Sequence, residues 1–245
     1  MNLKTLGEKK DFVTANLHAL PKAALENYTT AFAVEYTHNS TAIEGNTLTL
    51  RETALLLYDR LSVGGKELRE IYEVINHSKA FAYITERIAE GNPLDEKAVK
   101  DIHNILMENI MTGGIYRNVD VYISGAQHTP PNPNEMYRQI KNFYIDLDIK
   151  AMESIELAAW THAEFVKIHP FIDGNGRTSR LIMNYQLISG GYLPVSIPKE
   201  KRLEYYECLE EYAIAGNLTP FTTMIAELEE ARLDYYIEAI NQSRT

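Results

Sequence analysis

The sequence predicts a mainly α-helical fold that carries one β-hairpin. Apolar residues recur at helical spacing along most of the chain; in 154–168, for example, Ala158, His162 and Phe165 fall on one face. A single stretch, 116–124, alternates polar and apolar residues and is rich in β-branched and aromatic types, which indicates a strand. Because an isolated hairpin is only marginally stable, we expect it to pack against the helices.

The composition is that of an ordinary folded domain. Of the 245 residues, 45% are hydrophobic and 24% are charged, which excludes a disordered chain. The net charge of −10, without a basic patch, argues against nucleic acid as a partner. No stretch approaches the ~18 apolar residues of a membrane span, so no membrane partner is expected. Cys208 is the only cysteine, which excludes an intramolecular disulfide and favours a cytoplasmic location.

No internal repeat and no Pro- or Ser-rich linker divides the chain. We therefore expect one domain, 1–245, with an N-terminal region, 1–64, and a core, 65–245. The predicted helices cover about 21–28, 30–43, 50–62, 66–87, 95–111, 134–149, 154–168, 177–189 and 198–215, and a last one opens at 219–220. The helix at 50 begins with a capping box formed by Thr49 and Glu52.

The stretch 169–180 has the densest chemistry of the chain: His-Pro-Phe-Ile-Asp-Gly-Asn-Gly-Arg-Thr-Ser-Arg. Pro170 disfavours helix at the residue before it, so the preceding helix should end near His169. Gly174 and Gly176 accept positive φ, and the Asn between them tolerates it. The loop therefore predicts a nest of backbone N–H groups at the N-terminus of the next helix, which is a favourable place for an anion.

The side chains of this stretch suit phosphate chemistry. Arg177 and Arg180, three residues apart, can reach over one phosphate-rich ligand. Asp173 is a hard oxygen ligand for Mg²⁺ that bridges phosphates, and His169 suits a base that deprotonates a hydroxyl. A lone His-Pro or Gly-Asn-Gly is usually a helix end or a turn, but their combination points to function. The pattern is neither a Walker A loop nor a Rossmann fingerprint.

These twelve residues resemble the signature of the Fic family, His-x-Phe-x-(Asp/Glu)-Gly-Asn-Gly-Arg-x-x-Arg, and match it at every fixed position. The resemblance implies a Fic-type helical bundle that transfers AMP from ATP to a Ser, Thr or Tyr hydroxyl of a target protein or of the same chain. It implies His169 as general base, Asp173 as ligand of the Mg²⁺ cofactor, Gly174, Asn175, Gly176 and Arg177 as the phosphate cradle, and Arg180 as the clamp on the ATP γ-phosphate.

The segment 40–45, Ser-Thr-Ala-Ile-Glu-Gly, resembles the inhibitory motif of many Fic proteins, (Ser/Thr)-x-x-x-Glu-(Gly/Asn). By this resemblance Ser40, Glu44 and Gly45 belong to an inhibitory helix, about 30–44, that precedes the core. The physical expectation is a bidentate pair between Glu44 and Arg180, which occupies the arginine meant for the γ-phosphate. ATP would then bind with its α-phosphate misaligned for attack.

Two further parts follow the order of elements in Fic proteins. The hairpin is similar in position to the flap that holds the target segment by strand addition, with Ile123, Ser124, Gly125 and Gln127 as the candidate residues; a purely structural hairpin is the other interpretation. Tyr205 and Tyr206 resemble the tyrosine pair that flanks adenine and ribose, although by periodicity alone they fit core packing equally well.

Several alternatives stay open at the level of sequence. The same scaffold can remove AMP from a modified target, with Glu44 positioning a water, or transfer another phosphate-linked group. A non-catalytic nucleotide-sensing module is a third possibility, although it would need neither His169 nor Asp173. We assign no function to His77 or His103, and no His-x-x-x-His pair supports a zinc site. A homodimer through a helix around 66–88 is compatible with the pattern but not required by it.

Overall fold

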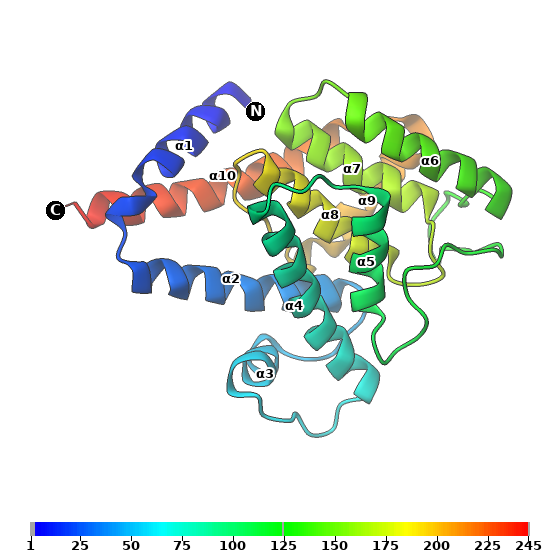
Figure 1. Cartoon of the computed structure of the whole chain (residues 1–245), viewed down its shortest axis with the longest axis horizontal. Helices are drawn as coiled ribbons and strands as arrows, with labels where there is room; N and C mark the ends of the chain where they lie inside the picture. Colours follow the sequence, from blue (N-terminus) through cyan, green and yellow to red (C-terminus); the bar gives the residue numbers. More distant parts are fainter. Residues whose placement is uncertain (1–2, 124, 245) are drawn as a thin grey trace.

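The computed structural model describes residues 3–123 and 125–244, and over these ranges it consists of helices joined by loops (Figure 1). The helices are α1 (Leu3–Asn16), α2 (Lys22–Ile43), α3 (Leu50–Ala54), α4 (Leu68–Ala89), α5 (Glu96–Leu106), α6 (Pro133–Ile149), α7 (Ser154–Ile168), α8 (Asn175–Ser189), α9 (Arg202–Ala215) and α10 (Thr219–Gln242). Short 3₁₀ turns lie at Leu17–Ala19 and Lys199–Lys201, and a π-helical turn lies at Leu55–Asp59. The predicted mainly α-helical class is confirmed.

Helices α7 and α8 form the centre of the molecule. Most of their residues are buried, and the two helices pack closely on each other. The bounds of α7 are those predicted from the sequence, whereas α8 begins at Asn175, inside the glycine loop. Helices α4 and α5 pack against α8, and α6 and α9 pack against α7, so that these four lie around the central pair (Figure 1). The loop 169–174 between α7 and α8 is therefore surrounded by several helices.

Helix α2 is one continuous helix, although the sequence predicted two segments. Thr29 lies between those segments, and its hydroxyl donates to the carbonyl of Leu25 at 2.9 Å, which keeps its polar group satisfied inside the helix. The last two turns of α2 are buried and carry polar side chains. The capping box of Thr49 and Glu52 is confirmed, but α3 is shorter than predicted because the chain continues as a π-helical turn.

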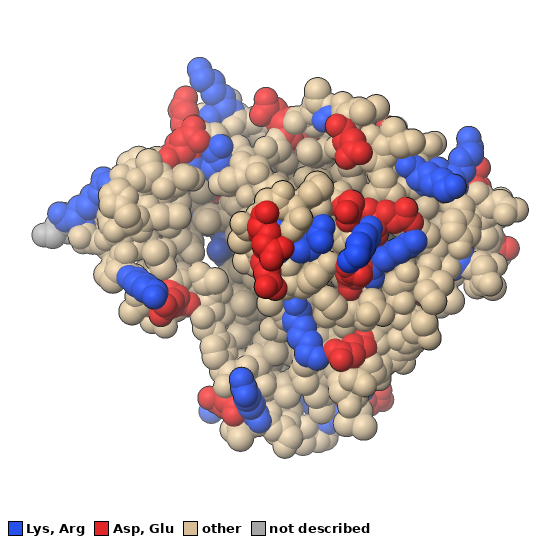
Figure 2. Space-filling model, viewed as in Figure 1, with Lys and Arg blue, Asp and Glu red and all other residues tan. Residues whose placement is uncertain are grey.

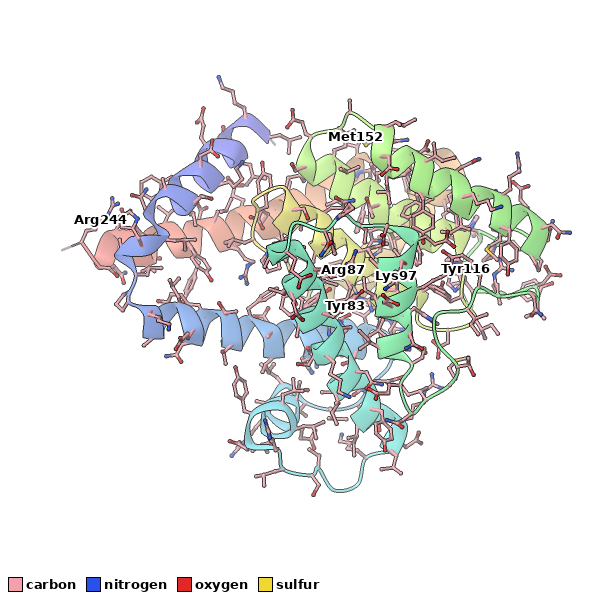
Figure 3. All side chains as sticks on the ribbon, viewed as in Figure 1. Tyr83, Arg87, Lys97, Tyr116, Met152 and Arg244 are labelled. Atoms are coloured by element: carbon pink, nitrogen blue, oxygen red, sulfur yellow. The ribbon has the colours of Figure 1, made fainter. Side chains whose placement is uncertain are left out.

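Polar contacts join α4 to α5 and to the turn that precedes α5 (Figure 3). The Tyr83 hydroxyl donates to Asp101 at 2.9 Å, and Lys97 pairs with the same carboxylate at 2.6 Å. Arg87 donates to the carbonyl of Pro93 at 3.2 Å. These contacts fix the helix pair that packs over α8 and, as described below, delivers residues from both helices to the loop.

The predicted hairpin is not present: no strand occurs in the ranges that the structure describes. Alternation predicts a strand only where one face is buried, and here Val119 and Tyr122 are 50% and 85% exposed. A strand also needs a neighbour, yet the backbone N–H of Arg117 donates to the carbonyl of Pro170 at 2.9 Å instead of to a ladder. The described residues of this region, 115–123 and 125–131, are irregular, and Arg117 joins them to the loop 169–174.

The surface carries both signs of charge. On the face drawn in Figure 2, acidic and basic side chains are interspersed and no continuous basic area is visible. Within the described residues, no helix has the combination of length and apolar character that crossing a membrane requires.

The close approach of α7 to α8 gives a stability prediction at Gly190, which caps α8. A methyl group at this position would lie 2.6 Å from Oγ and 2.7 Å from Cβ of Ser154, the first residue of α7. Rotation of the serine cannot relieve the second contact. We expect Gly190→Ala to lower the free energy of unfolding by about 1–3 kcal/mol, measured by urea denaturation.

The matched control is Gly64→Ala, because a Cβ at Gly64 meets nothing within 4 Å and its φ is not positive. We expect this variant to change the free energy of unfolding by about 0.5 kcal/mol or less. Equal effects of the two substitutions would contradict the packing described here.

Candidate active site

The predicted base stands where α7 ends. His169 adopts a left-handed conformation, φ 52°, which turns the chain out of the helix before Pro170. Its ring Nδ1 lies 3.2 Å from the carbonyl oxygen of Val166. Because a carbonyl only accepts, Nδ1 carries the proton of that bond, and Nε2 of the neutral ring holds the lone pair. Burial lowers the pKa of His169 to about 4, so the ring is neutral at pH 7.

One amide side chain clamps the loop. Asn175 accepts from the N–H of Phe171 and donates to the carbonyl of Phe171, both at 2.9 Å. Only 2% of Asn175 is exposed, so it braces the loop from inside. Gly174 has φ 76°, a conformation that favours glycine, and the end of the Met107 side chain lies close to it.

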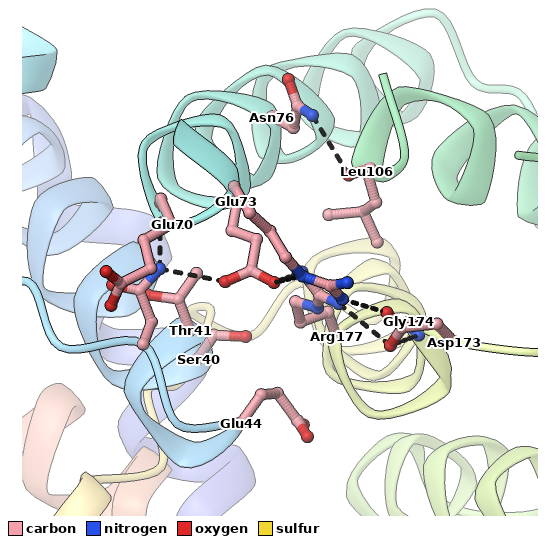
Figure 4. Close-up of polar contacts among 12 residues, drawn as sticks. Ser40, Thr41, Glu44, Glu70, Glu73, Asn76, Leu106, Asp173, Gly174 and Arg177 are labelled. Carbon is pink, nitrogen blue, oxygen red and sulfur yellow. Dashed lines mark hydrogen bonds and ion pairs between the residues drawn. The ribbon is translucent and has the colours of Figure 1, made fainter. Parts of the chain in front are cut away.

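Asp173, the predicted metal ligand, lies among cations. Its Oδ1 accepts from the N–H of Gly174 at 2.5 Å and lies 3.2 Å from Arg177, while its Oδ2 pairs with Arg69 of α4. Burial by itself would raise the pKa of Asp173, but Arg177, the Gly174 N–H and Arg69 hold it below its usual range. Glu73 of α4 contacts both arginines, at 3.2 Å and 3.1 Å. Figure 4 shows Arg177 between Glu73 and Asp173.

The donor set around Asp173 fits Mg²⁺ delivered with a phosphate substrate. A cavity of about 470 Å³ opens beside it, lined in part by Glu44, Arg69, Glu73 and Arg177. In the described part of the chain, no cluster of three or more His, Cys, Asp or Glu side chains could hold a metal ion by itself. Mg²⁺ commonly keeps waters and substrate phosphates as ligands and needs only one or two carboxylates, and the Asp173 side chain is 35% exposed.

Arg180 points away from Arg177 and toward α2. Its guanidinium is 1% exposed; Nε donates to Ser40 Oγ at 2.9 Å, and Nη2 donates to the Ser40 carbonyl at 2.7 Å and to Glu44 Oε1 at 2.8 Å. The pair with Glu44 is therefore a single contact, not the predicted bidentate one, because Ser40 takes the other donors on that side. Tyr205 and Glu44 raise the pKa of Arg180 although burial alone would lower it.

The Glu44 side chain also lies close to the second glycine of the loop. Glu44 follows the last residue of α2, and Gly45 turns the chain with φ 102°. A Cβ at Gly176, in the first turn of α8, would collide with Glu44 Oε1. The carboxylate thus lies at the N-terminus of α8, where the aligned backbone dipoles favour negative charge.

The tyrosine pair divides between core and surface. Tyr205 is 1% exposed, and its hydroxyl accepts from Arg180 at 3.2 Å and lies 3.0 Å from His162 Nε2, so it supports the arginine from within. Tyr206 is 37% exposed, and its hydroxyl donates to the carbonyl of Ile43 at 3.3 Å. Contact of either ring with a nucleotide stays a prediction.

The candidate target-holding residues that the structure describes form no strand. Ile123, Gly125 and Gln127 are described, whereas Ser124 lies outside the described residues. The N–H of Gln127 donates to Glu210 of α9. The ring of the next residue, His128, lies 2.9 Å from the carbonyl of Lys167 near the end of α7. Whether these residues hold a target stays a prediction.

Sequence reasoning missed His103, which supports the loop from α5. Its Nδ1 accepts from the N–H of Gly114 at 2.8 Å, so Nε2 is the donor to the carbonyl of Asp173 at 2.9 Å. The ring stacks on Phe171 with 3.6 Å between centroids. Burial lowers the pKa of His103 to about 4, which keeps this neutral tautomer at pH 7.

Arg117 was also missed, since it lay inside the predicted strand. It is 1% exposed, and its guanidinium donates to the carbonyls of His169 and Val119, both at 2.8 Å, and to that of Pro131. The buried Arg117 side chain thus joins His169, at the end of α7, to Val119 and Pro131.

Comparison with known proteins agrees with this architecture. The chain is 31% identical to the solved structure of Fic-1 from C. elegans, with a TM-score of 0.84, over 97% of this chain and 70% of that one. A Fic domain protein from Bacteroides thetaiotaomicron has a TM-score of 0.86 at 24% identity and covers 99% of this chain, which shows likeness of fold alone. The helical bundle around α7 and α8 is therefore a Fic fold.

The sequence comparisons name the same family. Residues 93–187 match the model of the Fic/DOC family. The chain is 36% identical over 246 residues to the protein adenylyltransferase Fic of Drosophila erecta, and the alignment covers 97% of this chain and 48% of the fly protein. This chain thus spans about half the length of the curated relatives it matches. The chain belongs to the Fic/DOC family.

The contacts of Arg117 give a test of its role in the loop. We expect Arg117→Met to lower the free energy of unfolding by about 3 kcal/mol or more, because an unsatisfied buried carbonyl costs about 1–3 kcal/mol. Urea denaturation measures the change. Arg138→Met is the matched control, since Arg138 is 69% exposed and, within 3–123 and 125–244, pairs only with its helix neighbour Glu135; we expect no measurable change. A similar loss in both variants would refute the supporting role.

Proposed function

We propose that this chain transfers AMP from ATP to a Ser, Thr or Tyr hydroxyl of a target protein. The observation that supports this most is the His169 ring at the loop before α8, neutral at pH 7 and with Nε2 free of hydrogen bonds to any described residue. The curated relatives named protein adenylyltransferase Fic point to the same activity.

In this proposal His169 is the general base. A target hydroxyl presented to Nε2 gives its proton to that nitrogen while its oxygen attacks the α-phosphorus and pyrophosphate leaves. The carbonyl of Val166 keeps Nδ1 protonated and stabilises the positive charge that the ring acquires. Since the protein does little covalent chemistry itself, most of the acceleration comes from positioning and electrostatics.

The phosphates are proposed to lie over the N-terminus of α8, where backbone N–H groups and the helix dipole favour anions. Asp173 would hold Mg²⁺, which supplies charge neutralisation to the phosphates when bound. Asp173 Oδ2 becomes available when Arg69 withdraws, and Arg69 can do so because its side chain is 53% exposed. Arg177 stays beneath the loop between its two carboxylates.

We further propose that Glu44 inhibits the reaction. It engages Arg180, the clamp proposed for the γ-phosphate, and lies at the N-terminus of α8 where a phosphate would be favoured. Substrate and Glu44 would therefore compete for the same positive charge. Removing the carboxylate leaves Arg180 held by Ser40 and Tyr205, so the clamp keeps its place.

One feature of Glu44 favours a second candidate function. Its side chain is 31% exposed, and Oε2 makes no hydrogen bond with a described residue. A carboxylate in this position can orient a water toward a phosphorus, so removal of AMP from a modified target is the alternative reaction. Incubating an AMPylated target with the unmodified chain and with Glu44→Gly separates the two, because only removal of AMP requires the carboxylate.

Two substitutions test the proposed transfer. We expect Glu44→Gly to raise incorporation of label from α-labelled ATP by roughly ten- to a hundredfold, the worth of a charged hydrogen bond. Adding His169→Ala to it should lower the rate by about 10²–10⁴-fold through loss of the base. His18→Ala, on the exposed turn after α1, is the control and should change nothing. Full incorporation without His169 would remove the base assignment.

The environment of His169 also predicts a pH dependence. Its pKa of about 4 in the folded chain lies below the ~6.5 of an unperturbed histidine. The ring is thus the neutral base throughout about pH 5–8, and activity should fall only as pH approaches 4. Between about pH 6.5 and pH 4 this histidine binds a proton in the unfolded chain but not in the folded one. His169 therefore lowers the free energy of unfolding as the pH falls through this range. NMR titration of the ring checks the value; a midpoint near 6.5 would contradict it.

A further inference from the structure

A second cavity lies between α2 and α10, apart from the active site. Its volume is about 380 Å³, which is in the size range of small-molecule sites, and none of its lining residues lines the active-site cavity. In Figure 1 α2 runs below α10, and Figure 2 shows the surface hollowed between them, with basic atoms in the hollow.

Arg232 of α10 is the one cation in the lining of this cavity. Its guanidinium has five N–H donors, yet none makes a hydrogen bond or an ion pair with a residue in 3–123 or 125–244, and Nε is buried without a partner. Its close contact is the ring of Phe32, 3.9 Å from Cζ. Burial lowers the pKa of Arg232 more than the nearby Tyr236, Glu229 and Glu35 raise it, so the cation has lost water that these groups do not fully replace.

The other walls offer aromatic rings and the hydroxyl of Ser196. The ring of Tyr28 meets Tyr235 and Tyr236 edge-on, with centroids at 5.3 Å and 5.7 Å, and all three line the cavity. Ser196 Oγ accepts from Asn39 at 3.0 Å, which leaves its own proton to donate to a ligand.

The charge of the rim selects the kind of anion. Glu35, exposed on the same face of α2 as Phe32, brings a negative charge to the cavity that contains Arg232. The Arg232 guanidinium balances one negative charge on a ligand. A second negative charge would be left unbalanced and repelled by the Glu35 carboxylate. A carboxylate is singly charged at pH 7, and its two oxygens match two parallel N–H donors of an arginine.

We propose that this cavity binds a small aromatic carboxylic acid, with its carboxylate on Arg232 and its ring among the tyrosines. The site is separate from the nucleotide chemistry and does not rest on it. The bound acid fills donors that the chain itself leaves empty, and its ring covers apolar surface on both α2 and α10.

The test uses the full chain with 2-naphthoate as the probe and calorimetric titration as the measurement. Arg232→Met removes the charge and keeps the length of the side chain. Ala31→Phe fills the cavity from an exposed position of α2 and leaves the charge in place. Arg138→Met, an exposed arginine on α6, is the control. We expect each of the first two variants to weaken binding by roughly tenfold or more, and the control to bind as the unmodified chain does.

Two further probes fix the class of ligand. The neutral 2-naphthamide should bind roughly tenfold or more weakly than the acid, since it lacks the charge. Phenyl phosphate should bind more weakly because of Glu35. The proposal is overturned if 2-naphthoate does not bind, if the amide or the phosphate binds as tightly as the acid, or if Ala31→Phe retains full affinity. The Ala31→Phe measurement tests the proposal even if Arg232→Met does not fold.

Discussion

A guanidinium with almost no exposure to water sets the arrangement of this structure. Arg180 sits at the junction of α2, α8 and α9, and an arginine cannot shed its charge to relieve the cost of burial. Each of the neighbouring elements therefore supplies an acceptor: Ser40 and Glu44 at the end of α2, and Tyr205 on α9. Among the polar residues at the end of α2, Ser40 and Glu44 meet this requirement, whereas Thr37 contacts His77 and Asn39 donates to Ser196. Ser40 and Glu44 also fix where the end of α2 lies against α8.

The same logic explains the loop between α7 and α8. Turning the chain out of α7 at His169 and into α8 at Asn175 leaves backbone groups that must be satisfied without a helix partner. Asn175, His103 and Arg117 satisfy them from three different parts of the chain. Because these supports are buried, they hold the backbone of the loop and leave its exposed groups free for other contacts.

The sequence was sufficient for features that depend on local rules. The bounds of α7, the stop at Pro170 and the capping box of Thr49 each follow from spacing, ring geometry or a side chain three residues away. Contacts across the fold were not predictable. His103 donates to the carbonyl of a residue 70 positions later in the chain, and Arg117 donates to carbonyls 52 and 14 positions later. The hairpin failed for the same reason: alternation signals a strand only when a partner and a buried face exist, and neither lies near in sequence.

The contacts of Arg180 also limit how the proposed inhibition by Glu44 could be relieved. Three of its four bonds go to Ser40 and Tyr205, which lie inside their helices, while only one goes to Glu44, which lies just past the end of α2. An arriving phosphate would have to replace a single charged contact, and rotation of one partly exposed side chain is enough to vacate it. Moving α2 as a body would instead break the bonds of Ser40 and strand the guanidinium, at a cost typical of a broken buried ion pair, about 3–5 kcal/mol. Exchange of the glutamate side chain with α2 in place is therefore the cheaper route.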